Sequence, residues 1–250
     1  MHKMEGLRVV IAGPTGSGKS AAGNAIFGRS VFTSAAGSCS VTQACESAEE
    51  EVEDVGKLLI VDTPSPLSPG QRRRCLQLCA PGPHAFLLTL RVGRYDEEDR
   101  NQVESLEKVF GEAMYNYTTV LFTHRDNMEM TGERLQDHIE NANPHLKSLL
   151  EKCGQRYHVF DNRKKDDRKQ VKELVKIVDE MVQANGGKHY ERPPSPYVKI
   201  ISVCTLFSCA ALLRCLWTYW NNVDDVKPVW FSGTVFGIGI IWLARQRLKY

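Results

Sequence analysis

Residues 7–20 read LRVVIAGPTGSGKS, an apolar run that leads directly into a glycine-rich turn. The run from Leu7 to Ala12 is rich in β-branched residues, as in a strand buried on both faces of a parallel sheet. The turn follows the pattern G-x-x-x-x-G-K-[ST], and a helix is expected after it. A strand, this turn and a helix together predict a P-loop, whose backbone N–H groups face phosphate oxygens.

The residue types within the predicted P-loop suit a nucleotide phosphate. Lys19 would reach the β and γ oxygens, and the Ser20 hydroxyl would ligate Mg²⁺. A glycine-rich turn without a ligand is the alternative, and the presence of both Lys and Ser disfavours it. The residues expected to bind the nucleotide here are Gly13, Pro14, Thr15, Gly16, Ser17, Gly18, Lys19, Ser20 and Ala21.

Apolar runs like the first recur along the chain and alternate with helical patterns. The runs cover residues 57–62, 85–90, 118–123 and 157–160. Apolar residues three or four apart are clearest at residues 96–110, 132–139 and 168–182. This alternation predicts an α/β fold with a doubly wound, mostly parallel sheet. With the P-loop, it predicts a P-loop NTPase G domain over residues 1–190.

A second motif expected near the nucleotide phosphates, Asp-Thr-Pro at residues 62–64, lies at the carboxyl end of the strand predicted at 57–62. Asp62 would reach Mg²⁺ there, because open α/β sheets bind ligands at the carboxyl ends of their strands. An isolated Asp-Thr-Pro turn is the alternative. Residues 28–45 are rich in Ser, Thr and Gly, and a γ-phosphate can order such a segment. Thr42 is the expected Mg²⁺-sensing hydroxyl in it, with Ser38 and Ser40 as competitors.

Polar residues also follow the strand predicted at 118–123, where the chain reads THRDN. A carboxylate at Asp126 would accept from N1 and N2 of guanine, and His124 would lie over the purine ring. An ordinary polar turn is the alternative. Asn162 ends the next predicted strand and would contact the base edge. The expected base-binding residues are His124, Arg125, Asp126, Asn127 and Asn162.

The composition changes near residue 197, after which charges are rare and Trp, Phe, Ile and Cys accumulate. Two apolar segments, about residues 198–220 and 229–244, predict a C-terminal hydrophobic helical hairpin that anchors the chain in a bilayer. Residues 191–197 would form a Pro-rich linker to this anchor, which covers residues 198–250. One span, two spans and a re-entrant hairpin stay open, as does packing of both segments on the G domain or in a dimer.

The N-terminal residues and the charges that flank the two apolar segments both predict a cytosolic G domain. The first residues contain no apolar run before a small-residue cleavage site, so no secretory signal is expected. Basic residues flank the outer ends of the two apolar segments, which places both ends in the cytosol. In that compartment the cysteines of the G domain are expected to be free thiols and not zinc ligands. The net charge is only +2, and we expect no nucleic-acid partner.

One block of sequence goes beyond the nucleotide motifs: APGPHAFLL at residues 80–88, then GRY at 93–95 and EED at 97–99. It resembles the conserved box of the GTPases of immunity-associated proteins, the GIMAP or immune-associated nucleotide-binding family with an AIG-type G domain. Matching stretches also occur at residues 20–24, 110–112, 121–124 and 160–163. The resemblance covers roughly residues 5–190.

The resemblance implies a guanine-nucleotide switch that binds GTP or GDP with Mg²⁺. It implies homo-oligomers formed through the G domain in the GTP state, commonly on intracellular membranes, and slow or absent GTP hydrolysis. It also implies that Ser34 lies near the nucleotide. The expected partners are therefore a guanine nucleotide, a lipid bilayer and a second copy of the chain.

Two features depart from the family pattern. Ser65 follows Asp-Thr-Pro where the family usually has Gly, and the base-reading Asp aligns with Asn127 in one register and Asp126 in another. Separately, no Gln corresponding to a water-positioning residue is apparent after Asp62, so a neighbour's side chain would complete hydrolysis. Residues 72–74 (RRR) are one source of it, unless they form a solvated helix face. The alternatives are a nucleotide-independent scaffold with a degenerate G domain and, less favoured, a P-loop phosphotransferase.

Overall fold

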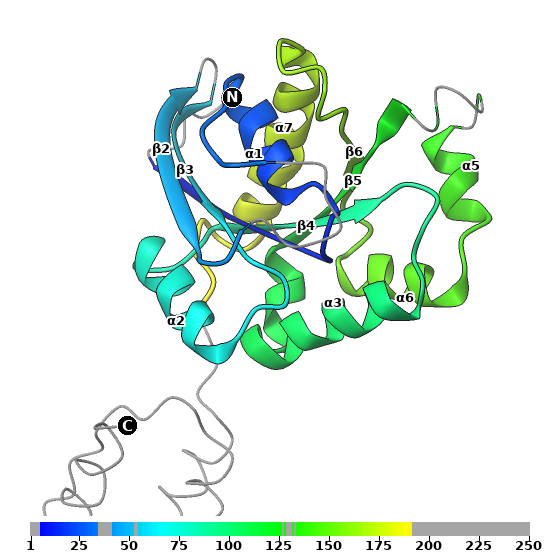
Figure 1. Ribbon diagram of the computed structural model, residues 1–250, viewed down its shortest axis with the longest axis horizontal. Helices are drawn as coiled ribbons and strands as arrows, with labels where there is room; N and C mark the ends of the chain where they lie inside the picture. The colour runs from blue at the N-terminus through cyan, green and yellow to red at the C-terminus, as the bar shows by residue number, and fades with distance from the viewer. Residues whose placement is uncertain are drawn as a thin grey trace, which may run out of the picture. The chain divides into compact units, whose positions relative to one another are not determined.

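The apolar runs predicted as strands form the centre of one sheet (Figure 1). The computed structural model describes residues 6–34, 42–52, 55–126, 128, 132 and 134–191. Its strands are β1 (Leu7–Ala12), β2 (Glu46–Val52), β3 (Gly56–Asp62), β4 (Ala85–Arg91), β5 (Thr118–Thr123) and β6 (Tyr157–Val159). Its helices are α1 (Lys19–Phe27), α2 (Pro69–Leu78), α3 (Glu97–Phe110), the 3-10 helix η1 (Glu112–Tyr117), α5 (Leu135–Glu140), α6 (Pro144–Lys152) and α7 (Arg168–Ala184).

The strands lie in the order β2-β3-β1-β4-β5-β6, and all neighbours are parallel except β2 and β3. The predicted mostly parallel, doubly wound sheet is therefore confirmed. The apolar runs did not reveal β2, whose sequence is ESAEEEV. This strand lies at the sheet edge with mostly exposed side chains, so it pairs through its backbone without the apolar pattern of a buried strand.

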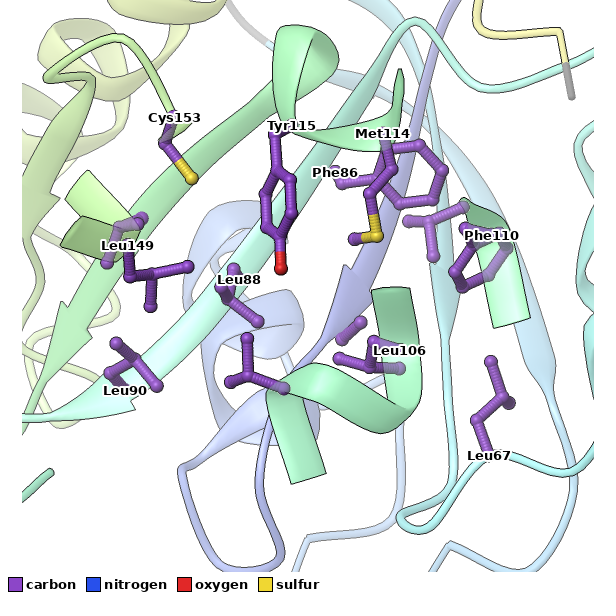
Figure 2. Close-up of a cluster of buried hydrophobic side chains, with 14 of the residues drawn as sticks. Leu67, Phe86, Leu88, Leu90, Leu106, Phe110, Met114, Tyr115, Leu149 and Cys153 are labelled. Atoms are coloured by element: carbon purple, nitrogen blue, oxygen red, sulfur yellow. The ribbon is translucent and has the colours of Figure 1, made fainter. Parts of the chain in front are cut away.

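Side chains that alternate along the strands fill two separate cores. Leu7, Val9 and Ile11 of β1 pack with the apolar faces of α1 and α7, whereas Val10 and Ala12 face the side of α2, α3 and α6. Figure 1 shows these two groups of helices on opposite faces of the sheet. The second core is aromatic: Phe86 and Phe110 lie 4.9 Å apart between ring centroids, and Met114 and Tyr115 of η1 pack beside them (Figure 2).

The segment after α7 returns to the sheet at the amino ends of its strands. Tyr190 is 1% exposed, and its N–H donates to Pro83 O at 2.7 Å. Its ring lies 5.2 Å from that of Phe86 between centroids, and its hydroxyl donates to Phe110 O. Tyr190 thus closes the aromatic core just before the predicted linker.

The predicted linker beyond Glu191 and the whole predicted anchor lie outside the described residues. Within the described part of the chain, no helix is both long and apolar enough to cross a membrane.

The described cysteines and the arginine run test two further expectations. Cys45, Cys75, Cys79 and Cys153 are free thiols, as predicted, and Cys39 lies outside the described residues. Arg72 is buried and donates to Val109 O at 3.0 Å, so the interpretation of the arginine run as a solvated helix face is wrong for this residue. Its guanidinium caps carbonyl oxygen at the end of α3 instead.

Candidate nucleotide-binding site

The P-loop connects the carboxyl end of β1 to the start of α1. Gly18 precedes α1 with a φ of +84°, and a Cβ at this position would lie 2.7 Å from Asn162 Nδ2. A Cβ at Gly13 would lie 2.4 Å from the backbone oxygen of Thr89. A Cβ at Gly13 would push the backbone of β4 away, whereas a Cβ at Gly18 would displace the Asn162 side chain and strain a left-handed backbone. The shape of this loop therefore depends on glycine at both positions.

Lys19 lies within the P-loop. The residue is 7% exposed, and Nζ donates hydrogen bonds to Gly13 O at 3.0 Å and to Pro14 O at 2.9 Å. Burial lowers the pKa of Lys19 to about 8, and the nearby charge of Asp62 opposes this shift. The loop therefore holds a buried ammonium group, which the negative charge of a phosphate would stabilise.

The three predicted Mg²⁺ ligands come together beside Lys19. Ser20 Oγ donates to Asp62 Oδ2 at 2.5 Å, Thr42 Oγ1 lies 3.4 Å from the same oxygen, and the two hydroxyl oxygens are 3.2 Å apart. The competitors Ser38 and Ser40 lie outside the described residues. The sequence favoured Thr42 over these two serines, and the structure places Thr42 beside the Asp62 carboxylate.

The donor set at this position fits a hard divalent cation that is shared with phosphate. Burial raises the pKa of Asp62, opposed mainly by the hydrogen bond from Ser20. Its Oδ1 is buried without a hydrogen-bond partner among the described residues, which leaves a carboxylate oxygen for Mg²⁺ or a Mg²⁺-bound water. No cluster of three or more His, Cys, Asp or Glu side chains suited to a metal occurs in the described ranges, so phosphate and water would supply the other ligands.

The start of the predicted base-binding segment is tied to the P-loop. Thr123 is buried, and its Oγ1 donates to Ser17 O at 2.8 Å. The same oxygen lies 2.9 Å from His124 Nδ1, which must be the donor because the hydroxyl proton is already used. The pKa of His124 is lowered mainly by burial of the ring, and the positive charge of Arg91 is the second cause of this shift. His124 has a φ of +61°, a backbone conformation unusual for a side chain of this size.

The remaining predicted base-binding residues are only partly brought together. Asn162 Nδ2 donates to Gly18 O at 3.2 Å, which holds the end of β6 against the P-loop. The carboxylate of Asp126 pairs with Arg163, with 3.2 Å between Oδ2 and the guanidinium. Arg125 lines a polar hollow with Asp167, Lys169, Gln170 and Glu173. Asn127 lies outside the described residues, so the choice between Asp126 and Asn127 stays a prediction.

Ser34 is exposed. The backbone that leads from α1 to Ser34 is held by the side chain of Asn24. Asn24 Oδ1 accepts from the backbone N–H groups of Val31 and Phe32, each at 2.7 Å. Phe32 is buried against α1, so the chain can be followed from the P-loop helix to two residues before Ser34. Ala21 lies in the first turn of α1. The roles of both residues toward the nucleotide remain predictions.

Residues of β4 that sequence reasoning missed also shape the P-loop. Thr89 Oγ1 lies 2.6 Å from Ser17 Oγ, and Arg91 Nε donates to Gly16 O at 2.8 Å. Arg163, which pairs with Asp126, was missed as well. The available signal was position: Arg91 ends a buried strand, and the carboxyl ends of neighbouring parallel strands share one edge of the sheet.

The fold and this edge together define a P-loop protein with a G-domain architecture. The sequence profile of the AIG1 family matches residues 7–200, and the chain belongs to this family. The family resemblance seen in the sequence is thereby confirmed.

Curated relatives agree with this family. Immune-associated nucleotide-binding protein 9 of Arabidopsis thaliana is 36% identical over 194 residues, which cover 73% of this chain and 57% of the relative. GTPase IMAP family member 8 of Mus musculus is 36% identical over 212 residues, which cover 79% of this chain and 30% of the relative. The chain therefore spans little more than half, or less, of the length of these relatives.

Solved structures share the fold at low identity. Toc33 from Arabidopsis thaliana in complex with GDP and Mg²⁺ is 18% identical with a TM-score of 0.52, over 71% of this chain and 84% of that chain. An Era variant from Aquifex aeolicus bound to GDP·AlF4⁻ is 16% identical with a TM-score of 0.51, over 70% of this chain and 57% of that chain. At these identities the likeness establishes the fold alone.

Proposed function

We propose that this chain binds GTP and GDP with Mg²⁺ and acts as a membrane-anchored switch and scaffold whose nucleotide state controls oligomerisation. The observation that carries the proposal is the meeting of Lys19, Ser20, Thr42 and Asp62 at one edge of the sheet. These residues come from three segments, and a structural role alone does not require two buried opposite charges beside a glycine-rich loop.

Each part of this edge has a task in nucleotide binding. Lys19 neutralises the β- and γ-phosphates, and the backbone N–H groups at the start of α1 orient them. Bound Mg²⁺ would neutralise developing charge on the phosphates. Ser20 and Asp62 would hold this ion, and Thr42 brings the segment before β2 to the same point. Because the Thr42 side chain contacts both Ser20 and Asp62, its segment is suited to respond to the nucleotide.

Guanine recognition is assigned to the segment after β5. Asp126 would accept from guanine N1 and N2 after exchanging its ion pair with Arg163 for the base. We expect Asp126→Asn to weaken GTP binding far more than Asn127→Ala does, because an amide presents donors to donors. The opposite ranking would move base recognition to Asn127. The Arg163–Asp126 pair is also the observation that favours the second candidate, a degenerate site in a nucleotide-independent scaffold.

Slow hydrolysis and assembly are the finer parts of the proposal. Pro66 follows Ser65, and residues 62–69 contain no Gln that would orient water, so intrinsic turnover is expected to be low. In atToc33 and psToc159, dimerisation is important for GTPase activity. We extend the idea of assembly through the G domain to this chain, with GTP-dependent association in sedimentation as its measurement.

Membrane attachment rests on the two apolar segments of the sequence. Deletion of residues 198–250 should release the protein from membranes and preserve nucleotide binding, whereas the full chain should resist alkaline carbonate extraction. Replacing Gly237 and Ile240 with Lys would test the second segment. Unchanged fractionation of that variant with membranes would show that this segment is not in the bilayer.

The central test is isothermal titration of the full chain in detergent with GTP, GDP and ATP in the presence of Mg²⁺. We expect both guanine nucleotides to bind and ATP to bind far more weakly. Binding of none of the three would establish the scaffold and overturn the proposal. Preferential binding of ATP would favour a phosphotransferase.

A further inference from the structure

Gln102 of α3 contacts the P-loop and the segment after Asp62 at the same time. Its Oε1 accepts from Thr15 N at 2.9 Å and from Ser65 Oγ at 2.7 Å. Thr15 Oγ1 also lies 3.3 Å from Ser65 O, so the two segments touch each other directly. One amide oxygen therefore joins three parts of the chain that are far apart in sequence.

The orientation of this amide is set by its other end. Gln102 Nε2 donates to Glu98 Oε1 at 3.3 Å, one turn earlier in α3. A carboxylate accepts and does not donate, so it selects the NH₂ end of the amide and turns Oε1 toward Thr15 and Ser65. The two short contacts, at 2.9 Å and 2.7 Å, match the two lone pairs of that oxygen, and Thr15 Oγ1 lies farther from it at 3.4 Å. An aliphatic side chain at this position would leave both donors without a partner.

The contact lies beside the groups assigned to the terminal phosphate. Thr15 follows Pro14, whose carbonyl oxygen accepts from Lys19 Nζ. Ser65 is three residues after Asp62, and it is 7% exposed. The segment from Asp62 to Ser65 is thus held against the P-loop at both of its ends, by Ser20 at Asp62 and by Gln102 at Ser65.

We propose that Gln102 is a positioning residue that makes the site favour the triphosphate over the diphosphate. The inference rests on the proposed nucleotide function. A γ-phosphate would meet the segment after Asp62, and a diphosphate would not reach it. Gln102 holds this segment in place before the nucleotide binds. GTP binding therefore loses less conformational entropy in ordering the segment, and the affinity for GTP is higher. The Ser at position 65, a departure from the family pattern, supplies the hydroxyl that makes this arrangement possible.

The experiment compares the full-length protein with Gln102→Ala, using GDP and the non-hydrolysable analogue GMPPNP as probes. The expected result is an affinity for GMPPNP that is about tenfold lower, with GDP binding within about twofold of wild type. Gln136→Ala is the matched control, because Gln136 Nε2 contacts Glu140 Oε1 one turn along α5 at 3.1 Å and the same kind of helix contact is lost. This control should change neither affinity.

Ser65→Ala gives a second, milder variant in case Gln102→Ala unfolds. It removes one donor and should lower the affinity for GMPPNP in the same selective way. The double variant should lose little more than Gln102→Ala alone, because both substitutions break one network. A merely structural role would lower the affinities for GDP and GMPPNP together.

The outcomes separate this inference from the proposed function. If the wild-type protein binds both nucleotides and Gln102→Ala leaves their affinity ratio unchanged, the inference is overturned and the nucleotide function stands. If wild type binds neither GDP nor GMPPNP, both fail. A selective loss of GMPPNP in Gln102→Ala and Ser65→Ala supports the inference.

Discussion

Both ends of the sheet carry polar side chains, but the carboxyl ends of the strands are arranged for binding and the amino ends for stability. At the carboxyl ends of the strands, Lys19 and Asp62 are buried charges, and Gly18 holds a left-handed backbone. At the amino ends, Arg8 N donates to His84 Nδ1 at 3.1 Å and Arg8 Nε donates to Gly82 O at 2.7 Å. Tyr190 then closes that end with aromatic contacts.

This difference indicates that contacts at the amino ends of the strands stabilise the fold, whereas the buried charges at the carboxyl ends favour binding at the cost of stability. Buried charges lower the free energy of unfolding unless a partner or a ligand compensates them. Satisfied hydrogen bonds and buried rings raise it. Substitutions at the carboxyl end should therefore affect binding, and substitutions at the amino end should affect stability.

The largest expected effect is that of Lys19→Ala on binding. The phosphates would lose their buried cation, which should cost about 4 kcal/mol of affinity, or about a thousandfold. Thermal stability of the unliganded protein should not fall, because the variant removes a buried charge whose pKa is lowered by burial. Titration of GTP and a thermal melt measure the two quantities. Normal GTP affinity in this variant would contradict the assignment of the site.

Tyr190→Ala should lower stability and leave nucleotide binding unchanged, the reverse of Lys19→Ala. Removing a ring that is 1% exposed should lower the free energy of unfolding by about 3 kcal/mol, with nucleotide affinity unchanged below the melting temperature. Tyr190→Phe is the matched control and should cost about 1 kcal/mol, because the ring stays and the hydrogen bond to Phe110 O is lost. Urea unfolding measures both variants. A large loss of GTP affinity in Tyr190→Ala would break the division between the two ends.

Gly18→Ala and Gly93→Ala separate backbone strain from site geometry. Their φ angles are +84° and +81°, so both should lose about 1–2 kcal/mol of stability. A Cβ at Gly93 meets nothing within 4 Å, whereas a Cβ at Gly18 would lie 2.7 Å from Asn162 Nδ2. Only Gly18→Ala should also weaken nucleotide binding in titration. Equal binding by the two variants would show that the Asn162 contact does not shape the site.

The smallest effect concerns pH and His84. Burial, with the charge of Arg8 second, lowers the pKa of His84 from 6.5 to about 4. The unfolded chain then binds more protons between these two values, so stability is complete above pH 6.5 and is lost as pH falls toward 4. Solvent reaches part of this ring, which keeps the effect small. His84→Gln should flatten the fall of melting temperature over this window, and an unchanged profile would exclude His84 as its source.

Some of the fold and the candidate site could be predicted because the signals are local. The apolar run of β1 and the spacing of Gly13, Gly18 and Lys19 are contained within a few neighbouring residues. The THRDN segment is equally local, and its role in base binding stays a prediction. The edge strand β2 could not be predicted, since its side chains face solvent and carry no apolar period. The start of α5 was also placed three residues too early, because its helical pattern is short.

The sequence by itself determined the P-loop, the alternation of the buried strands with helices, and the family, because these depend on spacing along the chain. Only the tertiary structure decided that Thr42 meets Asp62, that Arg163 pairs with Asp126 and that Gln102 joins Thr15 to Ser65. Thr15 and Gln102 are 87 residues apart, and a contact over such a distance leaves no periodic trace in a single sequence. It arises only when parallel strands bring their carboxyl ends to one edge of the sheet.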